Sequence, residues 1–302
     1  MNELAAYEAD IHLQPEFLES FQRQPLLLPR YYSNVIFSGS GDSFAASMLA
    51  EYFSGHAARS MDPMDLYKNR QLLRNRTVYF ISISGSTISN IRSAKIAPKS
   101  VAITANPDSM LAKSCTRIIP LQFPNAGIFT AGSIGFLSSA LTCISLFEKF
   151  KIRQPARIFA KAKMAAKATC VSGRIFLLGN SHTFPLAMYC AAKFYEILGI
   201  DAHYCRLEQF SHMELFSAKS GDTAIIFDEP SSYGRRLENN LRSAGLAVFA
   251  PKLISDNMIS RTLYFIFYSQ LLPLFMAKSH GQNNCHFVMA KKLRNSSCNM
   301  IY

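Results

Sequence analysis

The chain has 302 residues, of which 49% are hydrophobic and 17% are charged. This length and composition allow one large folded domain or two modest ones, and they exclude a disordered chain. The 32 Lys and Arg residues outnumber the 20 Asp and Glu residues, which gives a net charge of +12, but the basic residues are scattered. We therefore expect an anionic small-molecule partner or an ordinary solvated surface, and no nucleic acid partner.

The cysteines and the apolar segments indicate the compartment. The seven cysteines are odd in number and far apart, which argues against a disulfide framework or a zinc site and is typical of a reducing cytoplasm. The acidic N-terminus lacks the apolar core of a signal peptide. The most apolar segment, residues 263–276, contains Ser269, Gln270 and Pro273 and is shorter than the roughly 20 residues that cross a bilayer. We expect a cytoplasmic protein without membrane contact, metal ion or other cofactor.

The N-terminal residues 1–33 have the pattern of an amphipathic helical arm. Its prolines predict a break near Gln14-Pro15 and another between Pro25 and Pro29. Beyond this arm we predict two units, a first that covers residues 34–152 and a second that covers residues 153–302.

Short apolar strands alternate with helical segments in the first unit. The predicted strands are residues 34–38, 77–81, 100–105 and 117–122, and the predicted helices are residues 44–53, 88–95 and 132–150. A further predicted helix, residues 155–170, follows directly after this unit. Alternation of this kind is typical of parallel βαβ units with right-handed crossovers.

The second unit repeats the design of the first. Its predicted strands are residues 174–178, 223–227 and 245–250, and a predicted helix spans residues 184–198. Aligning Gly39 with Gly179 also pairs Ser43 with Thr183, Phe44 with Phe184 and Met48 with Met188. We therefore predict two tandem doubly wound parallel-sheet units of the flavodoxin-like kind, each with three α-β-α layers.

Hydroxyl side chains and one glycine follow the strand at residues 77–81 and precede the helix at residues 88–95. Small residues let backbone N–H groups approach a phosphate, hydroxyls donate further hydrogen bonds, and a helix N-terminus favours negative charge. We predict that the phosphate-binding residues are Ser82, Ser84, Ser86 and Thr87. An ordinary strand, turn and helix with a Ser or Thr cap is the alternative.

The corresponding loop of the second unit, residues 228–232, begins with Asp228-Glu229, whose carboxylates would repel a phosphate. We therefore expect only the first unit to bind a phosphate, while the second supplies groups to the other end of the ligand. The turn at residues 39–43 would line the same ligand, with Ser40 and Ser43 donating hydrogen bonds to it.

Three kinds of ionisable group stand out beyond these loops. They are the Lys193-Phe-Tyr-Glu196 segment, His212, and Lys291 near the C-terminus. A carboxylate, an imidazole and an amine are the groups that an aldose-ketose conversion needs, because the sugar ring must open and a proton must move between C1 and C2. The alternative is that Glu196 is a solvent-facing helix-end carboxylate, and that Lys193 lies along the helix surface with its amine in water.

Together these segments resemble the sugar isomerase (SIS) domain family, and within it the isomerase half of glucosamine-6-phosphate synthase. The matching motifs are Ser82-x-Ser84-Gly85-x-Thr87, Lys193-x-x-Glu196, His212 at the family's spacing, and Ala290-Lys291. The resemblance implies that Glu196 is the C1/C2 base, His212 opens the ring from the neighbouring subunit of a homodimer, and Lys291 meets the sugar carbonyl. Lys193 would bind substrate or orient Glu196. Two departures are Ser86, where the synthase has Glu, and Met213-Glu214, where it has Gly-Pro.

The resemblance implies a phosphosugar isomerase that acts on a hexose or hexosamine 6-phosphate through an enediol. Deamination of glucosamine 6-phosphate is an alternative, and a sensor that binds a sugar phosphate without turnover is a second. Asn2 follows Met1 where a glutamine-using enzyme would need cysteine, so we expect no glutamine-dependent amination. Residues 1–33 are too few for the helix-turn-helix domain that sensors of this family carry, which favours an enzyme.

Overall fold

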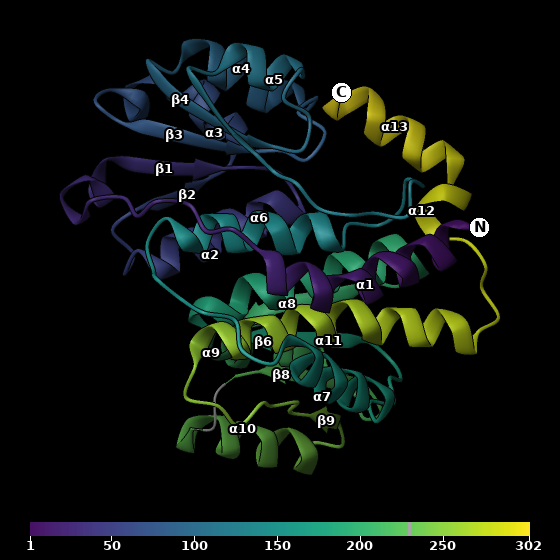
Figure 1. Ribbon diagram of the computed structural model, residues 1–302. Helices are drawn as coiled ribbons and strands as arrows, with labels where there is room; N and C mark the ends of the chain where they lie inside the picture. Colours follow the sequence, from purple (N-terminus) through teal and green to yellow (C-terminus); the bar gives the residue numbers. More distant parts are fainter. Residues whose placement is uncertain (229–230) are drawn as a thin grey trace. The chain divides into compact units, whose positions relative to one another are not determined.

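The computed structural model describes residues 1–228 and 231–302 (Figure 1). The chain folds into two compact units, each built around its own parallel sheet. The five-stranded unit contains Phe21–Asn125, Gly132–Lys151 and Ala290–Tyr302, and the four-stranded unit contains Met1–Ser20, Ala126–Ala131 and Ile152–Met289. The boundaries expected from the sequence, at residues 34 and 153, stay a prediction.

The sheet of the five-stranded unit has the strand order β2-β1-β3-β4-β5, and every neighbouring pair is parallel. Its strands are β1 (Val35–Ser38), β2 (Arg59–Met61), β3 (Thr77–Ile81), β4 (Lys99–Thr104) and β5 (Arg117–Pro120). Its helices are α2 (Asp42–Phe53), α3 (Pro63–Lys68), α4 (Ile88–Ile96), α5 (Met110–Ser114), α6 (Ile134–Ser145) and α13 (Lys291–Ile301), with 3-10 turns at Pro29–Asn34 and Arg70–Leu73. Because Ser38 lies opposite Phe80, β1 and β3 end at the same edge.

Successive strand residues point to opposite faces, and both faces of this sheet bury apolar side chains. On one face, Ile36, Phe80 and Ala102 form a core with Leu66 of α3 and Ala94 of α4. From the other face, the ring of Phe37 stacks on Tyr79 with centroids 4.9 Å apart. Burial on both faces explains why these strands are continuous apolar runs in the sequence.

The sheet of the four-stranded unit has the order β7-β6-β8-β9, and again every neighbouring pair is parallel. Its strands are β6 (Ile175–Gly179), β7 (Ala202–Arg206), β8 (Thr223–Phe227) and β9 (Ala247–Phe249). Its helices are α1 (Glu3–Ser20), α7 (Pro155–Lys167), α8 (Phe184–Lys193), α9 (Leu207–His212), α10 (Ser232–Ser243), α11 (Met258–Ser279) and α12 (His286–Met289). A π-helical turn, Phe194–Leu198, continues α8, and 3-10 turns lie at Ser181–Thr183 and Glu214–Ser217.

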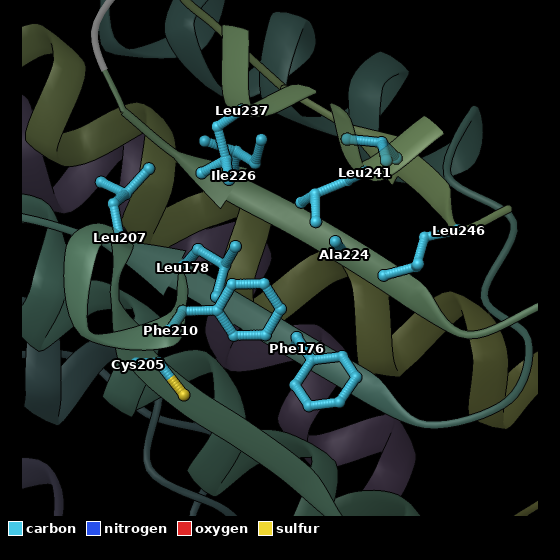
Figure 2. Packing of buried hydrophobic residues seen from close by; sticks show 11 residues of the cluster. Phe176, Leu178, Cys205, Leu207, Phe210, Ala224, Ile226, Leu237, Leu241 and Leu246 are labelled. Atoms are coloured by element: carbon cyan, nitrogen blue, oxygen red, sulfur yellow. The ribbon is translucent and has the colours of Figure 1, made fainter. Parts of the chain in front are cut away.

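One core of this unit lies between the sheet and the helices α9 and α10. Figure 2 shows Phe176, Leu178 and Ile226 of the sheet with Phe210 of α9 and Leu237 of α10. Phe227, the next residue of β8, packs instead against α11, where its ring centroid lies 5.2 Å from that of Phe265. These contacts bury both faces of β8, as the apolar run at residues 223–227 indicates.

The predicted helix break at Gln14-Pro15 is wrong, because α1 continues from Glu3 to Ser20 with Pro15 inside it. Proline removes one helical hydrogen bond, but packing of the helix opposes this loss. Ile11, whose carbonyl would accept the missing bond, and Gln14 are fully buried, and α1 packs against α7 and α11. The chain leaves the helix only after Ser20, before the second predicted break.

The apolar segment 263–276 is part of α11, most of which is buried in the four-stranded unit. Within residues 1–228 and 231–302, no helix combines the length and apolar character needed to cross a membrane. Of the acidic loop expected at residues 228–232, Glu229 and Pro230 lie outside the described residues, so its effect on a phosphate stays a prediction.

Candidate functional site

The loop after β3 is a tight turn that its own hydroxyls hold. The Ser82 hydroxyl accepts a hydrogen bond from the Gly85 N–H at 3.1 Å and lies 3.5 Å from the Thr87 hydroxyl. Both Ser82 and Thr87 are buried. The loop then passes into α4, whose cap residue Thr87 makes no capping hydrogen bond with its side chain.

The two other predicted phosphate ligands face outward. Ser84 and Ser86 are exposed, and their hydroxyl oxygens lie 2.7 Å apart. The Ser86 N–H also donates to the Ser84 oxygen at 3.3 Å. The four predicted residues therefore divide into an inner pair that braces the loop and an outer pair that presents two hydroxyls beside a helix N-terminus. This arrangement can bind an anion such as a phosphate ester.

Residues of the next strand and helix support the loop from behind, and no motif in the sequence points to them. Gly85 has φ +65°, and a Cβ there would lie 2.1 Å from the Ser109 hydroxyl and 3.2 Å from that of Thr104. The Thr104 hydroxyl donates to the Ile83 carbonyl at 3.1 Å, and Leu111 N–H donates to the Gly85 carbonyl at 3.1 Å. The available signal was the parallel sheet, which places the ends of residues 77–81 and 100–105 side by side.

The turn after β1 lies at the same edge of the sheet as this loop, because β1 and β3 are parallel neighbours in register. A Cβ on Gly39 would lie 2.6 Å from the Cβ of Ser43, so glycine allows α2 to start directly against the strand end. Ser40 is exposed and Ser43 is half-buried. The structure thus brings Ser40 and Ser43 to the sheet edge that carries the phosphate loop.

In the four-stranded unit, Lys193 and Glu196 form a close ion pair. The Lys193 Nζ donates to the Glu196 Oε2, and the Lys193 side chain is fully buried while the Glu196 side chain is 35% exposed. The ammonium also lies 5.0 Å from the centre of the Tyr189 ring. A buried ammonium needs such partners. Lys193 is therefore no surface lysine, and it orients a carboxylate that still reaches solvent.

Glu196 lies in the π-helical turn Phe194–Leu198 rather than in an ordinary helix end. The turn closes at Gly199, which has φ +68°, and Ile200 N–H donates to the Phe194 carbonyl at 3.3 Å. π-Helical turns inside helices are rare and frequent at functional sites. The sequence predicts a helix here, but it does not predict the wider turn.

The two remaining predicted catalytic residues lie on the surface of their units. His212 is the last residue of α9 and is exposed, beside the exposed Met213. Lys291 is the exposed first residue of α13, a helix without buried residues in the five-stranded unit. Neither takes part in the Lys193–Glu196 pair, so the roles of both stay predictions.

No three His, Cys, Asp or Glu side chains of the described residues form a group that could hold a metal ion.

No protein-family model and no curated protein sequence matches the chain. Solved structures do match it. Glucosamine-6-phosphate deaminase from Thermotoga maritima superposes with a TM-score of 0.74 at 16% identity, covering 93% of this chain and 95% of the other. The chain has the fold of this deaminase. Tagatose-6-phosphate ketose/aldose isomerase from Escherichia coli superposes with a TM-score of 0.67 at 18% identity, over 93% of this chain and 91% of the other.

The C-terminal domain of glucosamine-fructose-6-phosphate aminotransferase from Francisella tularensis gives a TM-score of 0.67 at 15% identity, over 94% of this chain and 95% of the other. This fold similarity agrees with the SIS resemblance found in the sequence motifs. At these identities it establishes the fold and leaves the reaction to the chemistry of the site.

Proposed function

We propose that the protein is a member of the SIS family and an aldose-ketose isomerase of a hexose or hexosamine 6-phosphate. The observation that carries this proposal is the Lys193–Glu196 pair, in which a fully buried ammonium holds a partly exposed carboxylate. A carboxylate fixed in this way is suited to moving one proton repeatedly between two carbon atoms. An ordinary surface carboxylate would not need a buried partner.

The substrate phosphate binds at the loop after β3 in this proposal. The exposed hydroxyls of Ser84 and Ser86 donate to its oxygens, while Ser82 and Thr87 hold the loop. The N-terminus of α4 adds a favourable electrostatic field for the dianion. Ser40 and Ser43 bind sugar hydroxyls.

Catalysis then follows the roles that the resemblance implies. His212 opens the sugar ring by proton transfer, Lys291 meets the open carbonyl, and Glu196 removes the C2 proton of the aldose and returns it to C1. Lys193 keeps the Glu196 carboxylate in place during both transfers. The exposed position of His212 is compatible with a homodimer in which this side chain serves the neighbouring subunit.

The finer structural and cellular assignments belong to the same proposal. Each unit is a doubly wound, three-layer α-β-α unit, for which the strand orders provide support. The protein acts in the cytoplasm, since its cysteines are all free.

A second candidate is deamination of glucosamine 6-phosphate, because the Thermotoga maritima structure with that name superposes with a TM-score of 0.74. The same carboxylate and imidazole serve this reaction, in which proton transfer from C2 to C1 gives an imine at C2, water adds to that imine, and ammonia leaves to give a ketose phosphate.

One screen tests the proposal and separates the two reactions. The purified protein is incubated with the 6-phosphates of fructose, glucose, mannose and glucosamine, and sugar interconversion and ammonia release are measured separately. Interconversion without ammonia supports the isomerase, and ammonia from glucosamine 6-phosphate supports the deaminase. Binding of a sugar phosphate without turnover of any would contradict both and indicate a sensor.

A further inference from the structure

The π-helical turn that carries Glu196 ends in an unusual contact with a histidine. Gly199 closes the turn with φ +68°, a backbone conformation that favours glycine. A Cβ built on Gly199 would lie 2.6 Å from each of three ring atoms of His286, namely Cγ, Nδ1 and Cε1. Because these three atoms are equally close, the face of the imidazole ring covers the Cα of the glycine. Glycine is needed here for space as well as for backbone conformation.

The segment that carries His286 is anchored at the residues on either side of it. Cys285 is fully buried, and its sulfur lies 3.6 Å from the Thr130 hydroxyl. Phe287 packs edge to face against Phe129, with ring centroids 5.7 Å apart. Val288 N–H donates to the Cys285 carbonyl at 3.1 Å and closes the turn. The ring of His286 is therefore held on Gly199 by a braced segment rather than by a free chain end.

The same segment also interacts electrostatically with the carboxylate of the turn. Burial raises the pKa of the Cys285 thiol, the hydrogen bond with Thr130 opposes this effect, and the nearby carboxylates of Glu196 and Glu3 raise the pKa further. The geometric contact between this segment and the turn is the packing of the His286 ring on Gly199.

A π-helical turn is less stable than an α-helix and persists only where its surroundings hold it. Within this turn, Gly199 N–H donates to the Tyr195 carbonyl at 3.1 Å, and the next N–H donates to the Phe194 carbonyl at 3.3 Å. We propose that His286 is a positioning residue whose ring, packed on Gly199, holds this turn in the conformation that directs Glu196 toward Lys193. The inference rests on the proposed role of Glu196 and adds a residue that the family motifs do not include.

The kinetic test compares His286→Ala and His286→Phe with the wild type, and uses His280→Ala, an exposed histidine after α11, as the control. We expect His286→Ala to lower kcat by about tenfold with little change in KM, because the carboxylate is misplaced while phosphate binding is kept. His286→Phe restores a flat ring over Gly199 and should recover most of kcat. A wild-type kcat in His286→Ala would overturn the proposal, as would a His286→Phe variant as slow as His286→Ala.

A structural readout keeps this test independent of the proposed reaction. Hydrogen exchange at the amides of Gly199 and Ile200 reports directly on the turn, and exchange in α7 serves as the internal control. His286→Ala should speed exchange at these two amides by about tenfold or more and leave α7 unchanged. If the wild type turns over no sugar phosphate, the proposed function fails while this measurement still tests the packing. Unchanged exchange in His286→Ala would overturn the inference in either case.

A double variant separates the ring contact from general damage. Gly199→Ala places a Cβ where the ring lies, so it should lower kcat and speed exchange even though the histidine is intact. In Gly199→Ala/His286→Ala the clash is gone. The fold-changes in kcat and in exchange rate should therefore be smaller than the product of those in the two single variants. Effects that simply multiply would show that the two residues act separately and would contradict the proposal.

Discussion

Ser84 and Ser86 differ from the other hydroxyls of their loop in one property, which is exposure. Replacing both with alanine removes donors to the phosphate but leaves the inner brace of Ser82 and Thr87 intact. Hydrogen bonds to a charged group contribute about 1.5 to 3 kcal/mol each, so we expect the Kd for a hexose 6-phosphate to rise at least tenfold. Calorimetry measures this Kd. Ser33→Ala, an exposed serine outside the loop, is the control. A Kd unchanged from the wild type would show that the phosphate binds elsewhere.

Asp222 is a buried carboxylate that links the residues just before strands β6 and β8 in the four-stranded unit. It accepts hydrogen bonds from the backbone N–H groups of Arg174 at 2.9 Å and Lys219 at 2.8 Å. The Arg174 guanidinium nitrogen lies 3.4 Å from the second oxygen. Burial by itself would raise the pKa of Asp222, but these hydrogen bonds and the guanidinium charge hold it below its usual value of 3.8.

A lowered carboxyl pKa contributes stability above the unfolded-state pKa, and this stability is lost as the pH falls through the folded-state pKa. Asp222→Asn would place an amide donor against a backbone donor and should cost about 1 to 3 kcal/mol at neutral pH. The variant should also lose less stability than the wild type below about pH 4. Urea unfolding at several pH values measures both, with Asp108→Asn, an exposed aspartate, as the control. Parallel stability curves for wild type and Asp222→Asn would contradict this assignment.

At the scale of elements, α1 is attached to α11 by a buried pair of amides. The Gln14 Nε2 donates to the Gln270 Oε1 at 2.7 Å, and neither residue is exposed. This contact helps to explain why α1 passes through Pro15 without a break. The cost of the proline is opposed by packing and by a hydrogen bond that no local propensity reports.

Changing Gln270 alone to leucine should destabilise the protein by about 1 to 3 kcal/mol, because the Gln14 amide is left buried without this partner. Changing both to leucine removes the unpaired amide and should recover most of that loss. Thermal unfolding followed by circular dichroism measures both variants. If the double variant is less stable than the single one, the pair is not the link between the two helices.

The strands that the sequence predicts well are those buried on both faces. Residues 77–81 and 223–227 are apolar apart from the first threonine of each, and they form β3 and β8 with the predicted bounds. β2 and β7 were not predicted, because β2 is a short polar edge strand and β7 mixes polar with apolar residues. Edge strands bury less, so the apolar signal in the sequence is weak.

The sequence indicates which residue types a candidate site would contain, but it does not indicate the backbone conformation that positions them. Residues three apart in a helix are neighbours on its surface, and the structure pairs Lys193 with Glu196. The π-helical turn and its contact with His286 depend on tertiary packing around Gly199, which a local pattern does not contain. The inward or outward direction of the loop hydroxyls likewise depends on support from Ser109 and Thr104.

At the scale of the whole chain, the sequence repeat has a counterpart in the two units. In each sheet the first strand in the sequence lies between the second and the third, and the fourth follows. At both aligned glycines a Cβ would clash with the residue four positions later. A Cβ on Gly39 would lie 2.6 Å from Ser43, and a Cβ on Gly179 would lie 2.7 Å from the Thr183 carbonyl oxygen. The repeat therefore preserves the turns in which a helix starts against a strand end.

The proposed mechanism depends most on Glu196 as the group that moves a proton at C2. The direct measurement is the rate at which the C2 proton of an aldose 6-phosphate substrate disappears in deuterated water, followed by NMR. Glu196→Gln keeps the shape of the side chain but removes the base, so this rate should fall by about 10² to 10⁴-fold while Kd stays near the wild-type value. Glu208→Gln, an exposed glutamate on α9, should keep the wild-type rate. A Glu196→Gln variant that exchanges the C2 proton as fast as the wild type would contradict the account.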